Sequence, residues 1–196
     1  MPSDLREFVQ PHQKGWPIVL HVGCGPANPL VLDPMFREGW VEVRLDIDPT
    51  VKPDIIGTIT DMSAVAPESA DAVWSSHNLE HLCAHEVPLA LREFHRALKP
   101  GGFLLTAMPD LKPVAEMIAS GALDEVAYVS PGGPITPRDM LYGYAPYIAG
   151  GNLFMTHKTG FTARTLCLEL ERAGFVGGET WSAGFNLWGL ARKARA

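Results

Sequence analysis

The segment from Val19 to Gly25 holds the residues whose types and spacing point most clearly to chemistry. An apolar run there breaks into the turn Gly23-Cys24-Gly25, and an acid, Asp46, ends the next apolar run 21 positions after Gly25. Glycines let a ligand approach the main chain closely, and a carboxylate can accept hydrogen bonds from both hydroxyls of a ribose. The spacing therefore predicts a binding site for an adenosine-type ligand.

The residues after Gly25 indicate which adenosine ligand this is. A dinucleotide site continues to a third glycine and offers backbone donors to a pyrophosphate. Here the continuation is Pro26-Ala27-Asn28-Pro29, whose prolines remove such donors. A ligand without phosphates, such as S-adenosylmethionine, fits better. A dinucleotide-dependent oxidoreductase stays as an alternative, which a titration with NAD would separate.

Length and composition set the frame for this site. With 196 residues, of which 46% are hydrophobic, the chain suits one α/β domain over 1–196 with an insertion. Its net charge of −6 disfavours a nucleic-acid partner. No apolar run approaches the length of a membrane span, and the charged N-terminus has no signal-peptide core. We therefore expect a cytoplasmic protein that acts on a small molecule.

The three cysteines, Cys24, Cys83 and Cys167, are far apart and show no metal-ligand spacing. A disulfide framework or a zinc site built on them is therefore not expected. Cys24 lies between the two glycines, where a small residue suits a tight turn better than a nucleophile does.

Strand and helix patterns alternate along the chain, which is typical of a parallel sheet in an α/β fold. Helical spacing of apolar residues predicts a helix from Val87 to Leu98, which Pro100-Gly101-Gly102 ends, and a second helix follows the N-cap residue Thr162. The expected strands are 18–22, 41–45, 54–57, 71–76, 103–108, 175–182 and 185–191, with the last two joined as a hairpin around Gly184.

The segment 113–157 breaks this alternation with many prolines and glycines. We interpret it as an irregular insertion over the carboxyl edge of the sheet, with one short helix near Pro137 to Tyr142. Long insertions in compact domains usually act as lids or binding loops. Its tyrosines could cover a polar substrate such as a sugar, or simply pack the insertion onto the domain; they are Tyr128, Tyr142, Tyr144 and Tyr147.

Five short motifs occur in order: Leu20-His21-Val22-Gly23-Cys24-Gly25, Leu45-Asp46-Ile47-Asp48, Asp61-Met62, Ser76-His77-Asn78-Leu79-Glu80-His81 and Leu98-Lys99-Pro100-Gly101-Gly102. In these motifs the chain resembles the class I S-adenosylmethionine-dependent methyltransferases of the methyltransferase type 11-like group. The resemblance covers roughly residues 16–110, and a weaker resemblance covers residues 156–192. The resemblance implies a Rossmann-like, doubly wound seven-stranded sheet with the last strand antiparallel and helices on both faces. The insertion then precedes the sixth strand.

The resemblance also implies cofactor contacts. Asp46 would bind the ribose hydroxyls, Ile47 would pack on the adenine, and Asp61 would accept from its amino group. Many members carry an acid where this chain has His21, and a third glycine where it has Ala27. The full set of implied cofactor residues is His21, Gly23, Cys24, Gly25, Asp46, Ile47, Asp61, Met62, Ser76 and His77.

Methyl transfer from a sulfonium is an in-line displacement, which mainly requires alignment and, for a hydroxyl acceptor, a general base. His77, which follows a strand at the ligand edge, is the first candidate base, although it could merely cap a helix beginning near Asn78. His81 lies four residues further on, beside Glu80, and with no third ligand evident we expect no metal. His157 is expected either to contact substrate or to pack or cap the returning chain.

These features together predict an S-adenosylmethionine-dependent methyltransferase. Its acceptor would be an oxygen or nitrogen of a small polar molecule, with a sugar or a related metabolite among the options. A catalytically silent protein that binds S-adenosylmethionine or S-adenosylhomocysteine is the alternative from a different class.

Overall fold

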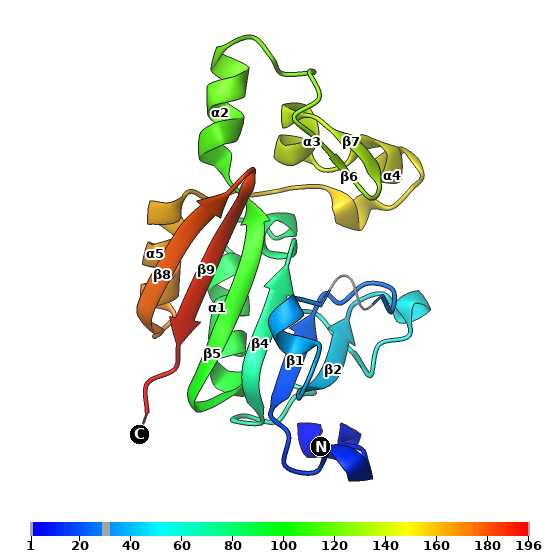
Figure 1. Cartoon of the computed structure of the whole chain (residues 1–196), viewed down its shortest axis with the longest axis vertical. Coiled ribbons are helices and arrows are strands. Elements are labelled where there is room, and N and C mark those ends of the chain that lie inside the picture. The colour runs from blue at the N-terminus through cyan, green and yellow to red at the C-terminus, as the bar shows by residue number, and fades with distance from the viewer. Residues whose placement is uncertain (1, 29–31, 196) are drawn as a thin grey trace.

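A mixed seven-stranded sheet forms the centre of the protein (Figure 1). The computed structural model describes residues 2–28 and 32–195, and within them the strands lie in the order β3-β2-β1-β4-β5-β9-β8. β9 runs antiparallel to both of its neighbours, whereas β1 to β5 pair in parallel. The strands are β1 (Ile18–Val22), β2 (Val41–Asp46), β3 (Ile55–Ile56), β4 (Ala70–Ser76), β5 (Leu98–Pro109), β8 (Val176–Ala183) and β9 (Asn186–Arg192).

The helices and shorter elements connect these strands. The α-helices are α1 (Val87–Ala97), α2 (Leu111–Ala119), α3 (Pro137–Tyr142), α4 (Ala145–Ala149) and α5 (Ala163–Arg172). A separate hairpin pairs β6 (Tyr128–Ser130) with β7 (Gly133–Ile135). Single 3-10 turns are η1 (Leu5–Phe8), η2 (Pro11–Gln13), η3 (Pro34–Phe36), η4 (Pro49–Val51), η5 (Leu79–His81) and η6 (Leu153–Met155).

The expected fold class is confirmed, including the antiparallel last strand that the resemblance implied. α1 buries the stripe that includes Leu91 and Phe94. α5 begins after Thr162, whose side chain accepts from the backbone N–H of Thr165 in a capping box. Both helices pack on the same face of the sheet, where Leu20 and other fully buried side chains form the largest apolar cluster. Figure 1 shows both helices behind the strands.

The opposite face corrects the expectation of helices on both sides, since no α-helix in the described part of the chain covers it. A smaller cluster lies there, in which Phe36 of η3 contacts Trp40, Trp74 and Phe103. The connection from β1 to β2 contains Pro26 and Pro34, and prolines inside a segment remove the hydrogen bonds that a helix needs. Aromatic side chains replace a helix over these strands.

The insertion lies above the carboxyl ends of the strands (Figure 1) and is more ordered than expected. The predicted short helix is present as α3, but α2, α4 and the hairpin β6–β7 were not anticipated. Its two ends meet: Asp110 and Phe161 form a parallel bridge, and the Leu111 N–H donates to the Phe161 carbonyl at 3.0 Å. Tyr128 stacks on Phe185 of the β8–β9 turn, with ring centroids 5.8 Å apart. These contacts fix the insertion over β4 and β5.

Candidate active site

The glycine loop and Asp46 are joined directly. The Gly25 N–H donates to Oδ2 of Asp46 at 2.8 Å, and the Asp48 N–H donates to Oδ1 at 2.9 Å. Asp46 ends β2 and is 8% exposed. Each carboxylate oxygen can accept more than one hydrogen bond, so capacity remains for two ribose hydroxyls. The pairing also fixes the position of the loop relative to β2.

The two glycines of the loop have different surroundings, although both have positive φ. At Gly25, no atom of the described residues lies within 4 Å of where a Cβ would stand. At Gly23, a Cβ would stand 1.7 Å from Oδ1 of Asn78, whose Nδ2 donates to the Val22 carbonyl at 2.7 Å. Gly25 therefore offers an open approach to the backbone, whereas Gly23 accommodates Asn78. Sequence reasoning missed this role of Asn78, and its only signal was its place at the end of β4.

Ile47 and Asp61, the residues expected to contact an adenine, are both exposed. Ile47 is 49% exposed, an unusual position for an isoleucine. Asp61 accepts from the Ser63 N–H at 3.0 Å, which lowers the pKa of its carboxyl below the ordinary value. Cys24 is buried, and burial raises the pKa of its thiol to about 11. The thiol is therefore protonated at neutral pH, in line with a small turn residue rather than a nucleophile.

Two residues assigned to the cofactor have buried side chains in this structure. His21 is 3% exposed, and its Nδ1 lies 2.7 Å from Oε1 of Glu42. It points to the same side of the sheet as Trp74, with which it is in register. The Met62 side chain is fully buried in the main core, and its N–H donates to Glu93 at 2.7 Å. A sequence motif identifies a residue, but only the fold determines whether the side chain of that residue is exposed.

His77 and Glu80 form a pair directly after β4, where Ser76 ends the strand. Nδ1 of His77 lies 3.0 Å from Oε1 of Glu80, whose side chain is fully enclosed, while 44% of the His77 side-chain surface stays open. Burial disfavours the imidazolium, yet the bond to Glu80, its charge and a bond to Asn186 together raise the pKa of His77. His77 also has φ of +53°, a conformation that few non-glycine residues adopt. Strain of this kind is concentrated at functional sites.

His81 and His157 lie next to this pair, although 76 positions separate them in the sequence. Their rings stand edge to face, with centroids 4.9 Å apart. Nδ1 of His81 lies 3.2 Å from the Thr156 carbonyl, and Nδ1 of His157 lies 2.8 Å from the Met140 carbonyl. Burial lowers the pKa of His157, so its ring is neutral at neutral pH. The fold therefore gathers all three histidines expected to be catalytic.

A cavity of about 130 Å³ lies between the end of the sheet and the insertion. Its lining combines the three histidines with aromatic, apolar and acidic side chains: His77, His81, Pro109, Tyr128, Ile135, Asp139, Met140, Tyr144, Met155 and His157. Of the four tyrosines, Tyr142 and Tyr147 do not line it and are largely exposed. Asp139 and Met140 were missed, because only the folding of the insertion brings α3 to the strand ends.

Residues 20–106 match the family model described as a methyltransferase domain. This segment runs from β1 into β5 and includes the glycine loop, Asp46 and His77. Together with the fold, the match supports an enzyme of the class I S-adenosylmethionine-dependent methyltransferases. No curated protein matches the sequence.

Solved structures share this fold at low sequence identity. A possible exported protein from Bordetella parapertussis is 20% identical, with a TM-score of 0.58; the match covers 97% of this chain and 64% of that one. An S-adenosylmethionine-dependent methyltransferase from Archaeoglobus fulgidus is 16% identical, with a TM-score of 0.58 and coverage of 96% and 91%. The Burkholderia thailandensis 1,6-didemethyltoxoflavin-N1-methyltransferase, with bound 1,6-didemethyltoxoflavin and S-adenosylhomocysteine, is 14% identical, with a TM-score of 0.56 and coverage of 96% and 76%.

In residues 2–28 and 32–195, no helix has the length and apolar character needed to cross a membrane.

Proposed function

We propose that this protein transfers a methyl group from S-adenosylmethionine to an oxygen or nitrogen of a small polar molecule held in the cavity beneath the insertion. The observation that carries the proposal is the position of the His77–Glu80 pair. It lies at the carboxyl end of β4, which neighbours the glycine loop after β1, and it faces the cavity. Ligands of α/β sheets bind at such a place, where the strand order reverses between β1 and β4.

In this proposal the cofactor lies over the open backbone of Gly25. Asp46 accepts the ribose hydroxyls, and the exposed residues Ile47 and Asp61 contact the adenine. Cys24 contributes backbone only, and Ser76 faces the reacting end from the strand terminus. When bound, the cofactor supplies an electrophilic methyl group. The toxoflavin-type methyltransferase with bound S-adenosylhomocysteine has the same fold, which supports this placement.

His77 would orient the acceptor and take its proton. Glu80 is held ionised, because its bond to His77 and the charge of His77 outweigh the effect of burial and lower its pKa. A carboxylate at Nδ1 fixes the tautomer with the proton on Nδ1, which leaves Nε2 as the base. A positioned base typically contributes about 10²–10⁴-fold to such a step. The proton of the acceptor hydroxyl or amine would pass to Nε2 as the new bond to the methyl forms.

The lining of the cavity suits a small polar acceptor. Tyr128 and Asp139 provide polar groups, while Ile135 and Met140 provide apolar surface. A net charge of −6 gives no electrostatic attraction for nucleic acid. A sugar or a related metabolite belongs to this proposed class of acceptor. We expect the protein to act in the cytoplasm.

The first test is calorimetric titration with S-adenosylmethionine, S-adenosylhomocysteine and NAD. We expect both sulfur ligands to bind and NAD not to bind, whereas binding of NAD alone would contradict the proposal. Turnover is then followed as S-adenosylhomocysteine released with pools of sugars, phenols and amines. Cofactor binding without turnover in any pool would favour the silent binding protein.

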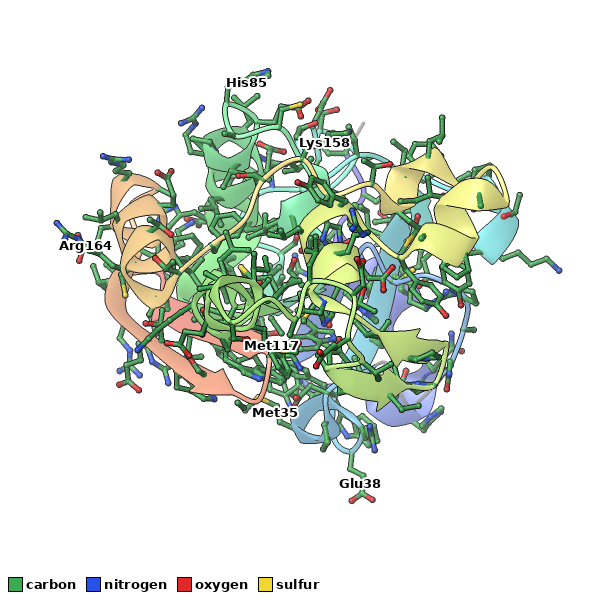
Figure 2. All side chains as sticks on the ribbon, turned by 90° about the horizontal axis from the view of Figure 1, so that it is seen from above. Met35, Glu38, His85, Met117, Lys158 and Arg164 are labelled. Carbon is green, nitrogen blue, oxygen red and sulfur yellow. The ribbon has the colours of Figure 1, made fainter. Side chains whose placement is uncertain are left out.

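A matched pair of variants isolates His77. His77→Asn suits the left-handed backbone at this position, because asparagine adopts it more readily than most residues do. His85→Asn is the control, since His85 points into solvent away from the insertion (Figure 2). We expect at least about a hundredfold loss of kcat in His77→Asn with little change in cofactor affinity. Equal activity in both variants would remove His77 from the mechanism.

A further inference from the structure

We propose that Glu80, His81 and His157 bind a divalent transition-metal cation, with Zn²⁺ as the representative ion. Each residue offers one ligand atom, and the three atoms lie within 4.8 Å of one another. Imidazole nitrogen and carboxylate oxygen are ordinary zinc ligands, and three protein ligands with one open position define a catalytic type of zinc site. Sequence spacing had suggested His77 with His81 and no third ligand, whereas the fold pairs His81 with His157 instead.

Both imidazoles are oriented as metal ligands are. A metal-bound histidine almost always donates its other ring N–H to a carbonyl or carboxylate, which fixes its tautomer. Here Nδ1 of His81 faces the Thr156 carbonyl and Nδ1 of His157 faces the Met140 carbonyl, at 3.2 and 2.8 Å. Since a carbonyl can only accept, both Nδ1 atoms carry a proton, and Nε2 is the nitrogen of each ring that is left to bind an ion. The rings are thereby set before any ion arrives.

Glu80 supplies a second, independent observation. Its side chain is buried, and Oε2 has no hydrogen-bond partner among the described residues. His77 bonds only the other oxygen, Oε1. A buried carboxylate oxygen without a partner is costly, and each such atom in a folded protein requires an explanation. A cation between Glu80 and the two neutral imidazoles would supply the missing partner.

The main chain holds the two ligand segments together. The N–H groups of Lys158 and Thr159 both donate to the Glu80 carbonyl, at 2.8 and 3.2 Å. The turn η5 carries Glu80 and His81, so the segment with His157 is fixed against it. Zinc bonds of about 2.0–2.1 Å imply ligand atoms roughly 3.3 Å apart in a tetrahedral site. Side-chain rotation of the imidazoles must supply this closing movement, with the main chain staying in place.

The remaining coordination position of such an ion would face the cavity, which His81 and His157 line. The expected occupant is water or an oxygen of a bound molecule. The metal site does not require methyl transfer, because its evidence is the ligand geometry alone.

Metal binding is tested on protein without an affinity tag, stripped with a chelator. Calorimetric titration with zinc chloride and competition with a coloured chelator should give one equivalent of bound Zn²⁺ per chain. His81→Gln and His157→Gln should each weaken binding by more than about tenfold, since loss of even an outer partner of a metal ligand costs 10–100-fold. His85→Gln should bind as the wild type does. Absence of stoichiometric binding, or equal affinity in all three variants, would overturn the proposal.

A second measurement uses the wild type alone, so that a misfolded variant cannot obscure the result. Diethyl pyrocarbonate modifies accessible neutral imidazoles, and peptide mass spectrometry locates each modified histidine. We expect Zn²⁺ to reduce modification of His81 and His157 and to leave that of His85 unchanged. Equal modification of His81 and His157 with and without Zn²⁺ would contradict the site, whatever the outcome of the methyltransferase assay.

Discussion

Asn78 lies directly against Gly23, with its amide oxygen where a Cβ of residue 23 would stand. Its Nδ2 meanwhile holds the carbonyl of Val22, the last residue of β1. The end of β4 thus supports the start of the glycine loop. Of the two loop glycines, Gly23 is required by the contact with Asn78, whereas Gly25 has open space beside it.

Gly23→Ala and Gly25→Ala should therefore differ in their effects on stability and on ligand affinity. Both incur the strain of positive φ, about 1–2 kcal/mol. Gly23→Ala must also displace Asn78 and lose its hydrogen bond, a further cost of about 1 kcal/mol. Gly25→Ala should retain more stability but lose affinity for S-adenosylmethionine. Urea unfolding and calorimetry measure the two effects.

Gly39→Ala is the control for strain alone, because Gly39 has φ of +73° and open space around it. If Gly23→Ala were no less stable than Gly39→Ala, the contact with Asn78 would have no energetic role.

Asp46→Ala should weaken binding of S-adenosylmethionine by more than about tenfold. Charge-assisted hydrogen bonds contribute about 1.5–3 kcal/mol, and this carboxylate would accept two from the ribose. Asp48→Ala serves as the control, since Asp48 caps the turn η4 through the Thr50 N–H and its pKa is lowered by that bond. Equal dissociation constants for the two variants would contradict the ribose role of Asp46.

His95 predicts a pH dependence of stability. Burial lowers its pKa below the ordinary 6.5, as does the positive charge of Lys193, although a bond with the Gly174 backbone opposes them. The unfolded chain therefore binds a proton at higher pH than the folded one does. The stabilising effect of neutral His95 is complete above pH 6.5 and is lost as the pH falls through the folded pKa.

The comparison is thermal unfolding of the wild type and His95→Gln at about pH 7.5 and about pH 5. Acidification should lower the melting temperature of the wild type more than that of the variant. A parallel decline of the two curves would show that His95 does not contribute.

On the sheet face that no described α-helix covers, replacing different tryptophans should reduce stability by different amounts. Trp188 stacks on Trp74 with centroids 5.8 Å apart, and the more exposed Trp181 stacks on Trp188 at 6.0 Å. Trp181→Ala should cost roughly 0.5–1.5 kcal/mol through the lost ring pair. Trp188→Ala should cost about 3–5 kcal/mol, because it removes the stacking contacts with both Trp74 and Trp181.

Urea denaturation followed by circular dichroism measures both variants. Val129→Ala, at a residue that is 75% exposed in the hairpin, should change stability by less than about 0.5 kcal/mol. A Trp188→Ala variant as stable as Val129→Ala would show that this face contributes little to the fold.

The sheet and its two packed helices could be predicted because periodicity is a local property. α1 and α5 were recognised from one apolar stripe each, and Thr162 marked the start of α5. The uncovered sheet face could not be predicted from a family likeness, since it depends on the prolines of one connection. The hairpin β6–β7 was also missed, because strands of three residues carry almost no periodicity.

The positions of the candidate site residues could be predicted in part for the same reason. The sequence placed Asp46 and His77 at the carboxyl ends of two strands, as the structure does, and in a parallel sheet these ends share one edge. The burial of the His21 and Met62 side chains could not be predicted in this way, since it depends on strand orientation and on packing in the core. The meeting of Glu80 with His157 required the complete path of the insertion.

The bridge between Asp110 and Phe161 has an evolutionary consequence. Because the chain leaves the sheet and returns to it at neighbouring positions, the intervening segment can change in length or sequence without disturbing the register of β5 or the placement of α5. The entropy of closing such a loop grows only slowly with its length. Recombination or insertion between these two anchors would therefore change the lining of the cavity while the sheet stays the same, and domain exchange in the laboratory can use the same two junctions.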